Sequence, residues 1–280
     1  MTDTRKDKTA VCEVCFHKCT LKEGQTGLCR ARTNQNGEIV PKNYGCISSA
    51  ALDPIEKKPL AFFYPGSMIL SIGSYGCNLR CPFCQNHEIA QQDLRDQCEK
   101  VTPQDVVNKA LELKPHGNIG IAFTYNEPMI SWEFIQDTAR LAHENGLKVV
   151  VVTNGTASVE TLEKILPYVD AFNVDLKGFS QSYYDWLQGD LEMVKEFIRK
   201  AAEKSHVEVT TLVVPGRNDS VEEMDALSSF LASIDPDIPL HITRYFPRWK
   251  EKESPTPIST LEKLEETAKR HLNRVRIGNV

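Results

Sequence analysis

The chain has 280 residues, 41% of them hydrophobic and 25% charged, with 33 Lys and Arg against 38 Asp and Glu. These proportions are typical of a globular protein, and the length suits one large α/β domain with a small appendage. The net charge of −5 argues against non-specific nucleic-acid binding, and no apolar run of about 18 residues predicts a transmembrane helix.

Nine cysteines are many for a chain whose charged first residues lack the apolar stretch of a signal peptide. We therefore expect a cytoplasmic protein with neither nucleic acid nor a membrane as partner. In that reducing compartment, thiols more often bind metals than form disulfides. Five of the cysteines fall in the first 60 residues, which show no sustained helix or strand period. The sequence thus predicts a cysteine-rich metal-binding extension over residues 1–60 and a main domain over 61–280.

The extension has too little apolar surface for a core of its own. Its cysteines follow the pattern Cys12-x2-Cys15-x3-Cys19-x9-Cys29. Four thiolates suffice for a structural zinc site or a second iron–sulfur cluster, and the spacing does not choose between them. Zinc is slightly favoured because it would supply folding energy, whereas a cluster could also carry electrons. The two remaining cysteines outside clusters, at 46 and 98, are predicted to be ordinary thiols.

From about residue 67 the chain alternates strand-like and helix-like patterns. Runs rich in β-branched and aromatic residues predict buried strands over 68–72, 119–124, 147–153, 171–176, 207–214 and 239–245. The intervening segments predict helices over 102–113, 132–145, 159–166, 191–204, 221–234 and 261–272. The first helix begins at Thr102-Pro103, an N-cap followed by proline. Successive strand–helix units imply a parallel sheet with right-handed crossovers, curled into a partial (β/α)6 TIM barrel.

Three cysteines follow the first predicted strand within one short loop, Cys77-x3-Cys81-x2-Cys84. Three thiolates bind a [4Fe–4S] cluster with one fewer ligand than full protein ligation requires. The fourth iron is then open to a small molecule, so the loop is a candidate site for chemistry. A zinc knuckle or unrelated free thiols are the alternatives, and the position after a strand and a glycine turn makes them less favourable.

Polar residues follow each of the other predicted strands, and the carboxyl ends of barrel strands meet at one mouth. The candidates are Tyr125, Asn126, Glu127, Asn154, Asp175, Lys177 and, on the last strand, His241. Taken singly they could be turn residues, helix caps or a surface ion pair. Together with the cysteine loop, they predict a ligand pocket at the mouth of the barrel.

The pattern Cys77-x3-Cys81-x-Phe83-Cys84 resembles the signature of radical S-adenosylmethionine (SAM) enzymes. More narrowly, the chain resembles the glycyl-radical-enzyme activases and the AmmeMemoRadiSam-system proteins, which are pyruvate formate-lyase-activating-enzyme-like. The matching stretches are 51–60, 84–86, 123–128, 174–177, 243–247 and 278–280.

The resemblance implies a [4Fe–4S] cluster on Cys77, Cys81 and Cys84, with SAM bound at the open iron. Residues 125–128 occupy the place of the Gly-Gly-Glu-Pro motif that holds the amino group of SAM. Within them Glu127 is retained, whereas Asn126 replaces a glycine. Other residues match positions that contact the methionine or ribose portion of SAM: Asn154, Asp175 and Lys177. The activases supply a histidine to SAM from the last strand where this chain has Phe246, and His241, earlier on that strand, is the candidate to point inward in its place.

The activity implied is reductive cleavage of SAM to methionine and a 5′-deoxyadenosyl radical, which abstracts hydrogen from a substrate. Flavodoxin or ferredoxin is the expected electron donor. The substrate, a small molecule or a protein, is not identified by the sequence. The alternatives are a glycyl-radical-enzyme activase, a radical methyl- or adenosyl-transferase, and a non-catalytic metal-binding regulator.

Overall fold

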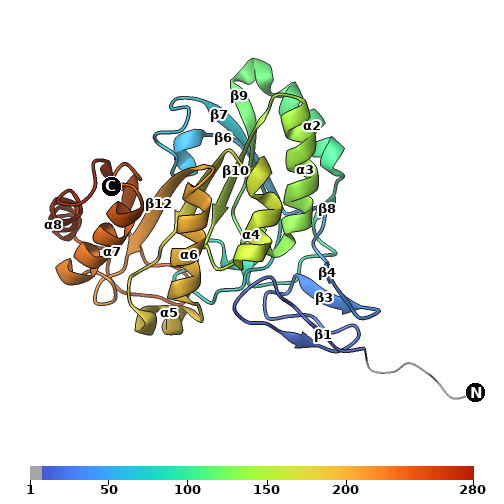
Figure 1. Cartoon of the computed structure of the whole chain (residues 1–280), viewed down its shortest axis with the longest axis horizontal. Helices are drawn as coiled ribbons and strands as arrows, with labels where there is room; N and C mark the ends of the chain where they lie inside the picture. Colours follow the sequence, from blue (N-terminus) through green and yellow to red (C-terminus); the bar gives the residue numbers. More distant parts are fainter. Residues whose placement is uncertain (1–7) are drawn as a thin grey trace, which may run out of the picture.

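The computed structural model describes residues 8–280, and its centre is a twisted eight-stranded sheet (Figure 1). The strands lie in the order β14-β13-β12-β11-β10-β9-β7-β6. Seven of them run parallel: β7 (Met68–Gly73), β9 (Asn118–Phe123), β10 (Lys148–Thr153), β11 (Ala171–Asp175), β12 (His206–Val213), β13 (Leu240–Arg244) and β14 (Val275–Gly278). The edge strand β6 (Ser49–Pro54) is antiparallel to β7.

The six predicted strands are all present, with ends within one or two residues of their predicted positions. Two strands of this sheet were not predicted. The four residues of β14 were too few to show a period, and every residue of β6 except Asp53 is exposed or half-exposed because the strand lies at the sheet edge. Because β6 hydrogen-bonds to β7, residues 49–54 of the predicted extension form the edge of the main sheet.

Helices cover the outer face of the sheet (Figure 1). The predicted ones are α2 (Pro103–Glu112), α3 (Trp132–Glu144), α4 (Val159–Ile165), α6 (Leu191–Ala202), α7 (Val221–Ile234) and α8 (Ile258–Ala268). Thr102 and Asp105 form a capping box at the start of α2. Two short helices were missed, α1 (His87–Ala90) and α5 (Gln181–Leu187), and there are 3-10 turns at Ile55–Lys57 (η1), Lys114–His116 (η2), Pro128–Ser131 (η3) and Leu166–Tyr168 (η4). Among residues 8–280, no helix is long and apolar enough to cross a membrane.

The segment 55–63, which we call the plug, fills the barrel interior toward the amino ends of the strands. Its Ile55, Leu60 and Phe63 pack in one apolar cluster with residues of β7, β9, β10 and β11. The carboxylate of Glu208, on β12, accepts hydrogen bonds from the backbone N–H groups of Ala61 (3.0 Å) and Phe62 (2.8 Å). The interior is therefore closed at one end, which leaves the carboxyl ends of the strands for a ligand.

The cysteine-rich extension forms small two-stranded sheets and has little core of its own. Its strands are β1 (Ala10–Val11), β2 (Thr20–Leu21), β3 (Arg32–Gln35) and β4 (Glu38–Pro41). The Arg32 guanidinium pairs with Glu133 of α3 at 2.7 Å, and the backbone N–H of Ser158 donates to the carbonyl of Val14 at 2.9 Å. Figure 1 places the extension (dark blue) at the same end of the molecule as α5. It thus folds against the main domain.

The prediction that Cys46 and Cys98 are ordinary thiols is wrong, because the structure joins them in a disulfide. The short strands β5 (Cys46–Ile47) and β8 (Glu99–Lys100) pair antiparallel, which brings the two Cα atoms to 5.4 Å. The cysteines are 52 residues apart, and a pairing between two-residue strands leaves no pattern in the sequence.

Candidate functional site

The cysteine loop follows β7 at the carboxyl edge of the sheet. Cys81 is buried, whereas Cys77 and Cys84 are half-buried. The backbone N–H of Leu79 donates to Cys77 Sγ at 3.3 Å, and the backbone N–H of Asn86 lowers the pKa of the Cys84 thiol against the larger effect of burial. Such donors stabilise the thiolate form that metal ligation requires.

Aromatic residues of α5 and β13 support this loop from one side. The carbonyl of Leu187 in α5 accepts from the backbone N–H of Arg80 at 2.9 Å. The ring of Phe83 packs against Trp186 and Tyr245, with centroids 5.8 and 6.5 Å apart. Sequence reasoning missed these supports, although the Tyr-Tyr-Asp-Trp-Leu stretch over 183–187 is an aromatic run that could have drawn attention to α5.

Burial raises the pKa of all three loop thiols. For Cys77 the negative charge of Glu127 adds to the effect, and the pKa lies well above its usual value. Burial raises the pKa of Cys81 to about 11, although the ammonium of Lys177 lowers it. A bound metal would replace the thiol protons, so binding here is coupled to proton release.

Asn126 holds the backbone that leads into the loop. Its side-chain oxygen accepts from the N–H of Ser74 at 2.9 Å, and its amide donates to the carbonyls of Tyr75 (3.2 Å) and Gly76 (3.1 Å). A glycine could make none of these contacts. Asn126, which stands where the Gly-Gly-Glu-Pro motif has a glycine, thus holds the backbone at the start of the cysteine loop.

We expect Asn126→Ala to loosen the loop, because three backbone groups lose their partner and one buried hydrogen bond is worth about 1 kcal/mol. The variant should bind fewer iron atoms per chain after anaerobic reconstitution and should unfold at lower urea concentration. Asn108→Ala on the exposed surface of α2 serves as the control, since within residues 8–280 its side chain hydrogen-bonds only to Gln104. Equal iron content in the two variants would contradict the prediction.

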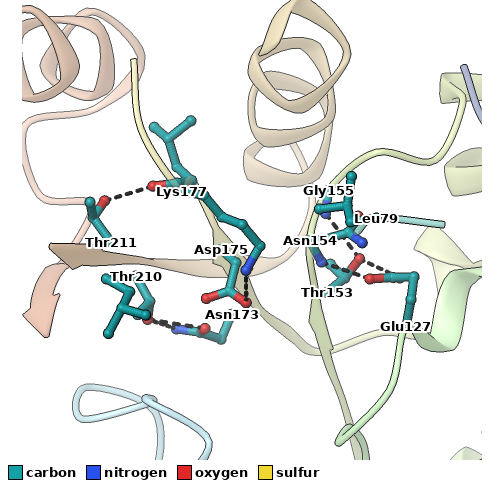
Figure 2. Close-up of polar contacts among 12 residues, drawn as sticks. Leu79, Glu127, Thr153, Asn154, Gly155, Asn173, Asp175, Lys177, Thr210 and Thr211 are labelled. Carbon is teal, nitrogen blue, oxygen red and sulfur yellow. Dashed lines mark hydrogen bonds and ion pairs between the residues drawn. The ribbon is translucent and has the colours of Figure 1, made fainter. Parts of the chain in front are cut away.

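Glu127 is a buried carboxylate, 3% exposed, that ties the ends of two strands together. It accepts from the Thr153 hydroxyl (2.7 Å) and from the backbone N–H groups of Asn154 (2.8 Å) and Met129 (3.0 Å) (Figure 2). Burial raises its pKa to about 7, against the opposing effect of these hydrogen bonds. Glu127 therefore sets the position of Asn154, and a cationic group at the free side of the carboxylate would favour its charged form.

Asn154 lies directly beside the first cysteine. Its amide nitrogen is 3.7 Å from Cys77 Sγ and 2.9 Å from the side-chain oxygen of Asn78. The side chain of Asn78 in turn donates to the Thr156 hydroxyl at 2.8 Å. The carboxyl end of β10 is thus in contact with the cysteine loop, as the strand-end pattern predicted.

Tyr125 adopts a left-handed backbone with φ of 71°, which is uncommon for a residue with a bulky side chain. Its hydroxyl donates to Asp53 at 2.9 Å, and the ammonium of Lys58 lies 4.6 Å from its ring centroid. Burial opposes ionisation of Asp53, but hydrogen bonds from Lys58 and Tyr125 hold its pKa at about 2. This Tyr125–Asp53–Lys58 group was not predicted, and the strained backbone is a marker of functional sites.

Asp175 and Lys177 form an ion pair of 3.0 Å at the end of β11 (Figure 2). Burial disfavours the ammonium of Lys177, but the charges of Asp175 and Cys81 raise its pKa well above the usual value. Lys177 is thus a cation close to the cysteine loop, and Asp175 remains partly open to solvent.

The structure gives His241 a partner that the sequence did not suggest. Its ring nitrogen Nε2 lies 2.6 Å from the carboxylate of Glu208, which also contacts His206 at 2.9 Å. His241 does point into the barrel, but toward the plug and away from the cysteine loop. Glu208 itself was missed, although a charged residue within the apolar run 207–214 is a detectable signal.

The approach of the extension to the cysteine loop depends on Gly76, whose φ is 88° and whose Cα faces the carbonyl of Cys29. We expect Gly76→Ala to displace the loop, destabilise the fold by more than about 1 kcal/mol and reduce iron content. Gly66→Ala is the matched control, since Gly66 has φ of 82° and an added methyl group there would meet no atom within 4 Å. Equal losses in both variants would show that backbone strain, and not the close approach, is responsible.

The residues present fit a three-thiolate cluster. Besides the thiols and their N–H donors, the hydroxyl of Tyr183 is buried without a hydrogen-bond partner in residues 8–280, and the charge of Cys81 contributes to its raised pKa. It is therefore a donor available to a sulfur-rich group. Within the same residues, no three His, Cys, Asp or Glu side chains are arranged to hold one metal ion; a cluster instead takes one thiolate for each of several irons.

Comparison with known families decides the assignment, since the model of the radical SAM superfamily matches residues 71–228, more than half of the chain. The chain belongs to the radical SAM superfamily. Enzymes of this superfamily use a [4Fe–4S] cluster and SAM, and the loop of Cys77, Cys81 and Cys84 carries the corresponding motif. The predicted superfamily, [4Fe–4S] cluster and SAM are confirmed, whereas the metal at Cys12, Cys15, Cys19 and Cys29 stays a prediction.

Two curated relatives illustrate the range of similarity. An uncharacterised protein of Methanocaldococcus jannaschii is 39% identical over 279 residues, covering 98% of this chain and 82% of that protein. Pyruvate formate-lyase-activating enzyme of Staphylococcus aureus is 25% identical over 171 residues, covering 57% of this chain and 67% of the enzyme. This radical SAM protein is therefore activase-like in sequence.

Solved structures share the fold at low sequence identity. SuiB of Streptococcus suis bound to S-adenosylmethionine has a TM-score of 0.59 and 15% identity, covering 73% of this chain and 48% of SuiB. A radical SAM methyltransferase from Sphaerobacter thermophilus has a TM-score of 0.57 and 16% identity, covering 77% of this chain and 67% of the methyltransferase. The α/β fold predicted from the sequence, a partial TIM barrel, is confirmed.

Proposed function

We propose that this protein cleaves SAM reductively and uses the resulting radical to abstract hydrogen from a polar substrate bound inside the barrel. When bound, the cluster supplies the electron, and SAM supplies the 5′-deoxyadenosyl group. The protein binds and orients both, and it shields the reacting atoms from water. The chain would work in the cytoplasm with a one-electron donor such as flavodoxin or ferredoxin.

One observation carries the proposal: the cysteine loop lies within hydrogen-bond reach of the neighbouring strand ends. Asn154 contacts Cys77, Glu127 holds Asn154, and Lys177 is near Cys81. We propose that Glu127 and Asn154 hold the charged amino-acid end of SAM, and that Asp175 and Lys177 bind its ribose or carboxylate. Carboxylate, amide and ammonium groups supply the acceptors and donors that these polar portions need.

The substrate would lie between this edge and the plug. The interior there presents the Tyr125–Asp53–Lys58 group, with Asp53 9% and Lys58 3% exposed, together with Asn173 and Thr210, which hydrogen-bond to each other at 2.9 Å (Figure 2). Such a lining of buried charged and polar groups recognises a polar molecule better than an apolar one.

We further propose that the substrate is not a glycyl-radical enzyme. The extension packs against the cysteine loop: Phe16 joins the apolar cluster around Leu79 and Phe83, and His17 Nε2 lies 2.8 Å from the carbonyl of Asn78. An activase must admit a glycine loop of its partner, and a cover at this edge restricts that entry. The 25% identity to a pyruvate formate-lyase-activating enzyme keeps activation as the second candidate.

The test is anaerobic incubation of the reconstituted protein with SAM and dithionite, followed by analysis of 5′-deoxyadenosine. The proposal expects 5′-deoxyadenosine to form, and none would indicate a binding protein without this chemistry. A glycyl-radical doublet in electron paramagnetic resonance with a candidate partner enzyme would instead support the activase. Transfer of the adenosyl or methyl group to a product would assign the protein as a transferase.

A further inference from the structure

The four cysteines of the extension lie close together and remain unpaired with one another. Three are buried, Cys12, Cys15 and Cys29, with exposures of 5%, 8% and 6%. The pairing of β1 with β2 brings Cys12 next to Cys19, whose carbonyl accepts from the Cys12 N–H at 3.0 Å. Four neighbouring thiols without a disulfide, in a segment with little core of its own, indicate a metal site.

Backbone donors point at these sulfurs as they do in the Cys77 loop. Burial raises the pKa of the Cys12, Cys15 and Cys29 thiols, and the backbone N–H two residues further along (of Val14, His17 and Ala31) lowers it in each case. The N–H groups of Leu79 and Asn86 act in the same way on the pKa of Cys77 and Cys84. The two groups of cysteines are therefore prepared for thiolate ligation in the same way.

Arg32 supplies a second, independent observation. Burial raises the pKa of the Cys12 thiol and the guanidinium of Arg32 lowers it, and Arg32 is 4% exposed. In residues 8–280, its Nε has no conventional hydrogen-bond partner, although the other nitrogens bind Glu133 and Ile39. An unpartnered buried N–H beside a cysteine sulfur is a donor for a negatively charged metal–thiolate group.

Residues next to the cysteines of one group contact residues of the other group. His17 of the extension lies 2.8 Å from the carbonyl of Asn78, the residue next to Cys77, and Gly76 faces the carbonyl of Cys29. The guanidinium of Arg80 donates to the carbonyls of both Cys77 and Leu28. These contacts place the two groups of cysteines next to each other in the fold, as electron transfer between them would require.

We propose that Cys12, Cys15, Cys19 and Cys29 ligate a second [4Fe–4S] cluster that passes electrons to the cluster on the Cys77 loop. Four thiolates satisfy all four irons, so this cluster has no open site for SAM. A reduced flavin or iron–sulfur donor would lose one electron to the second cluster, which would lose one electron in turn to the first. The relay rests on the proposed function; the presence of the cluster does not.

The full chain is purified and reconstituted anaerobically with iron and sulfide, and iron, sulfide and zinc are measured beside electron paramagnetic resonance spectra. We expect about eight irons per wild-type chain and about four in the Cys77→Ala/Cys81→Ala/Cys84→Ala variant. The remaining signal should not respond to added SAM. Cys98→Ala, which removes a cysteine outside both groups, should keep all the iron.

One zinc and no iron in the triple variant would overturn the proposal, and so would the absence of any metal. Because the triple variant leaves the extension intact, the outcome does not depend on whether variants of the extension fold. Wild-type protein that holds both clusters but forms no 5′-deoxyadenosine would contradict the proposed function and leave the second cluster standing.

Discussion

Replacing Cys81 by Ala should reduce 5′-deoxyadenosine formation to the level seen without protein. Cys81 is the most buried of the three loop cysteines and lies near Lys177. Removing it leaves two thiolates for a cluster that needs three from the protein, so the variant should hold about four fewer irons than the wild type. Iron content and product formation are measured on the same anaerobic preparation.

Cys98→Ala is the matched control, because it removes one cysteine that belongs to neither group of free cysteines. It should keep both the iron and the activity. The prediction fails if Cys81→Ala still cleaves SAM, or if Cys98→Ala loses iron to the same extent. The first outcome would remove Cys81 from the cluster, and the second would give the Cys46–Cys98 disulfide a role in forming the site.

The elements predicted correctly were those whose sequence pattern continues over many residues. A buried parallel strand such as β10, with four consecutive valines, is apolar throughout because both faces are covered. The capping box of α2, which spans the four residues 102–105, likewise marks where the helix begins. Local patterns of this kind are set by burial and backbone hydrogen bonding, and both can be read along the chain.

The elements missed depend on contacts between distant segments. The disulfide between Cys46 and Cys98 requires two short strands to pair, and the Tyr125–Asp53–Lys58 group requires the plug to enter the barrel. The same limit applies within the site. The motif placed Asn126 at a glycine position, but only the structure shows its amide holding the carbonyls of Tyr75 and Gly76.

Glu208→Gln should cost about 3 kcal/mol of folding free energy at neutral pH. Glu208 is fully buried, and its carboxylate pairs with His206 and His241 while it accepts two backbone N–H groups of the plug. Hydrogen bonds to a charged group are each worth about 1.5–3 kcal/mol, and the amide retains part of the hydrogen bonding. The measurement is the urea midpoint of each chain, with the slope expected to stay unchanged.

The pH dependence separates this role from simple loss of packing. Burial opposes the charge on Glu208, but the two histidines and the plug N–H groups lower its pKa from about 4.5 to about 2. A carboxyl with a lowered pKa stabilises the fold above its unfolded pKa, and this stabilisation is lost as pH falls from about 4.5 to about 2. The difference between wild type and Glu208→Gln should therefore be constant above about pH 5 and shrink below it.

Both chains are compared without metal, so that loss of a cluster in acid does not enter. If the difference in free energy of unfolding stays constant down to about pH 2, the effect of the substitution would come from packing and not from the charge. The plug would then be held by its apolar residues rather than by this carboxylate.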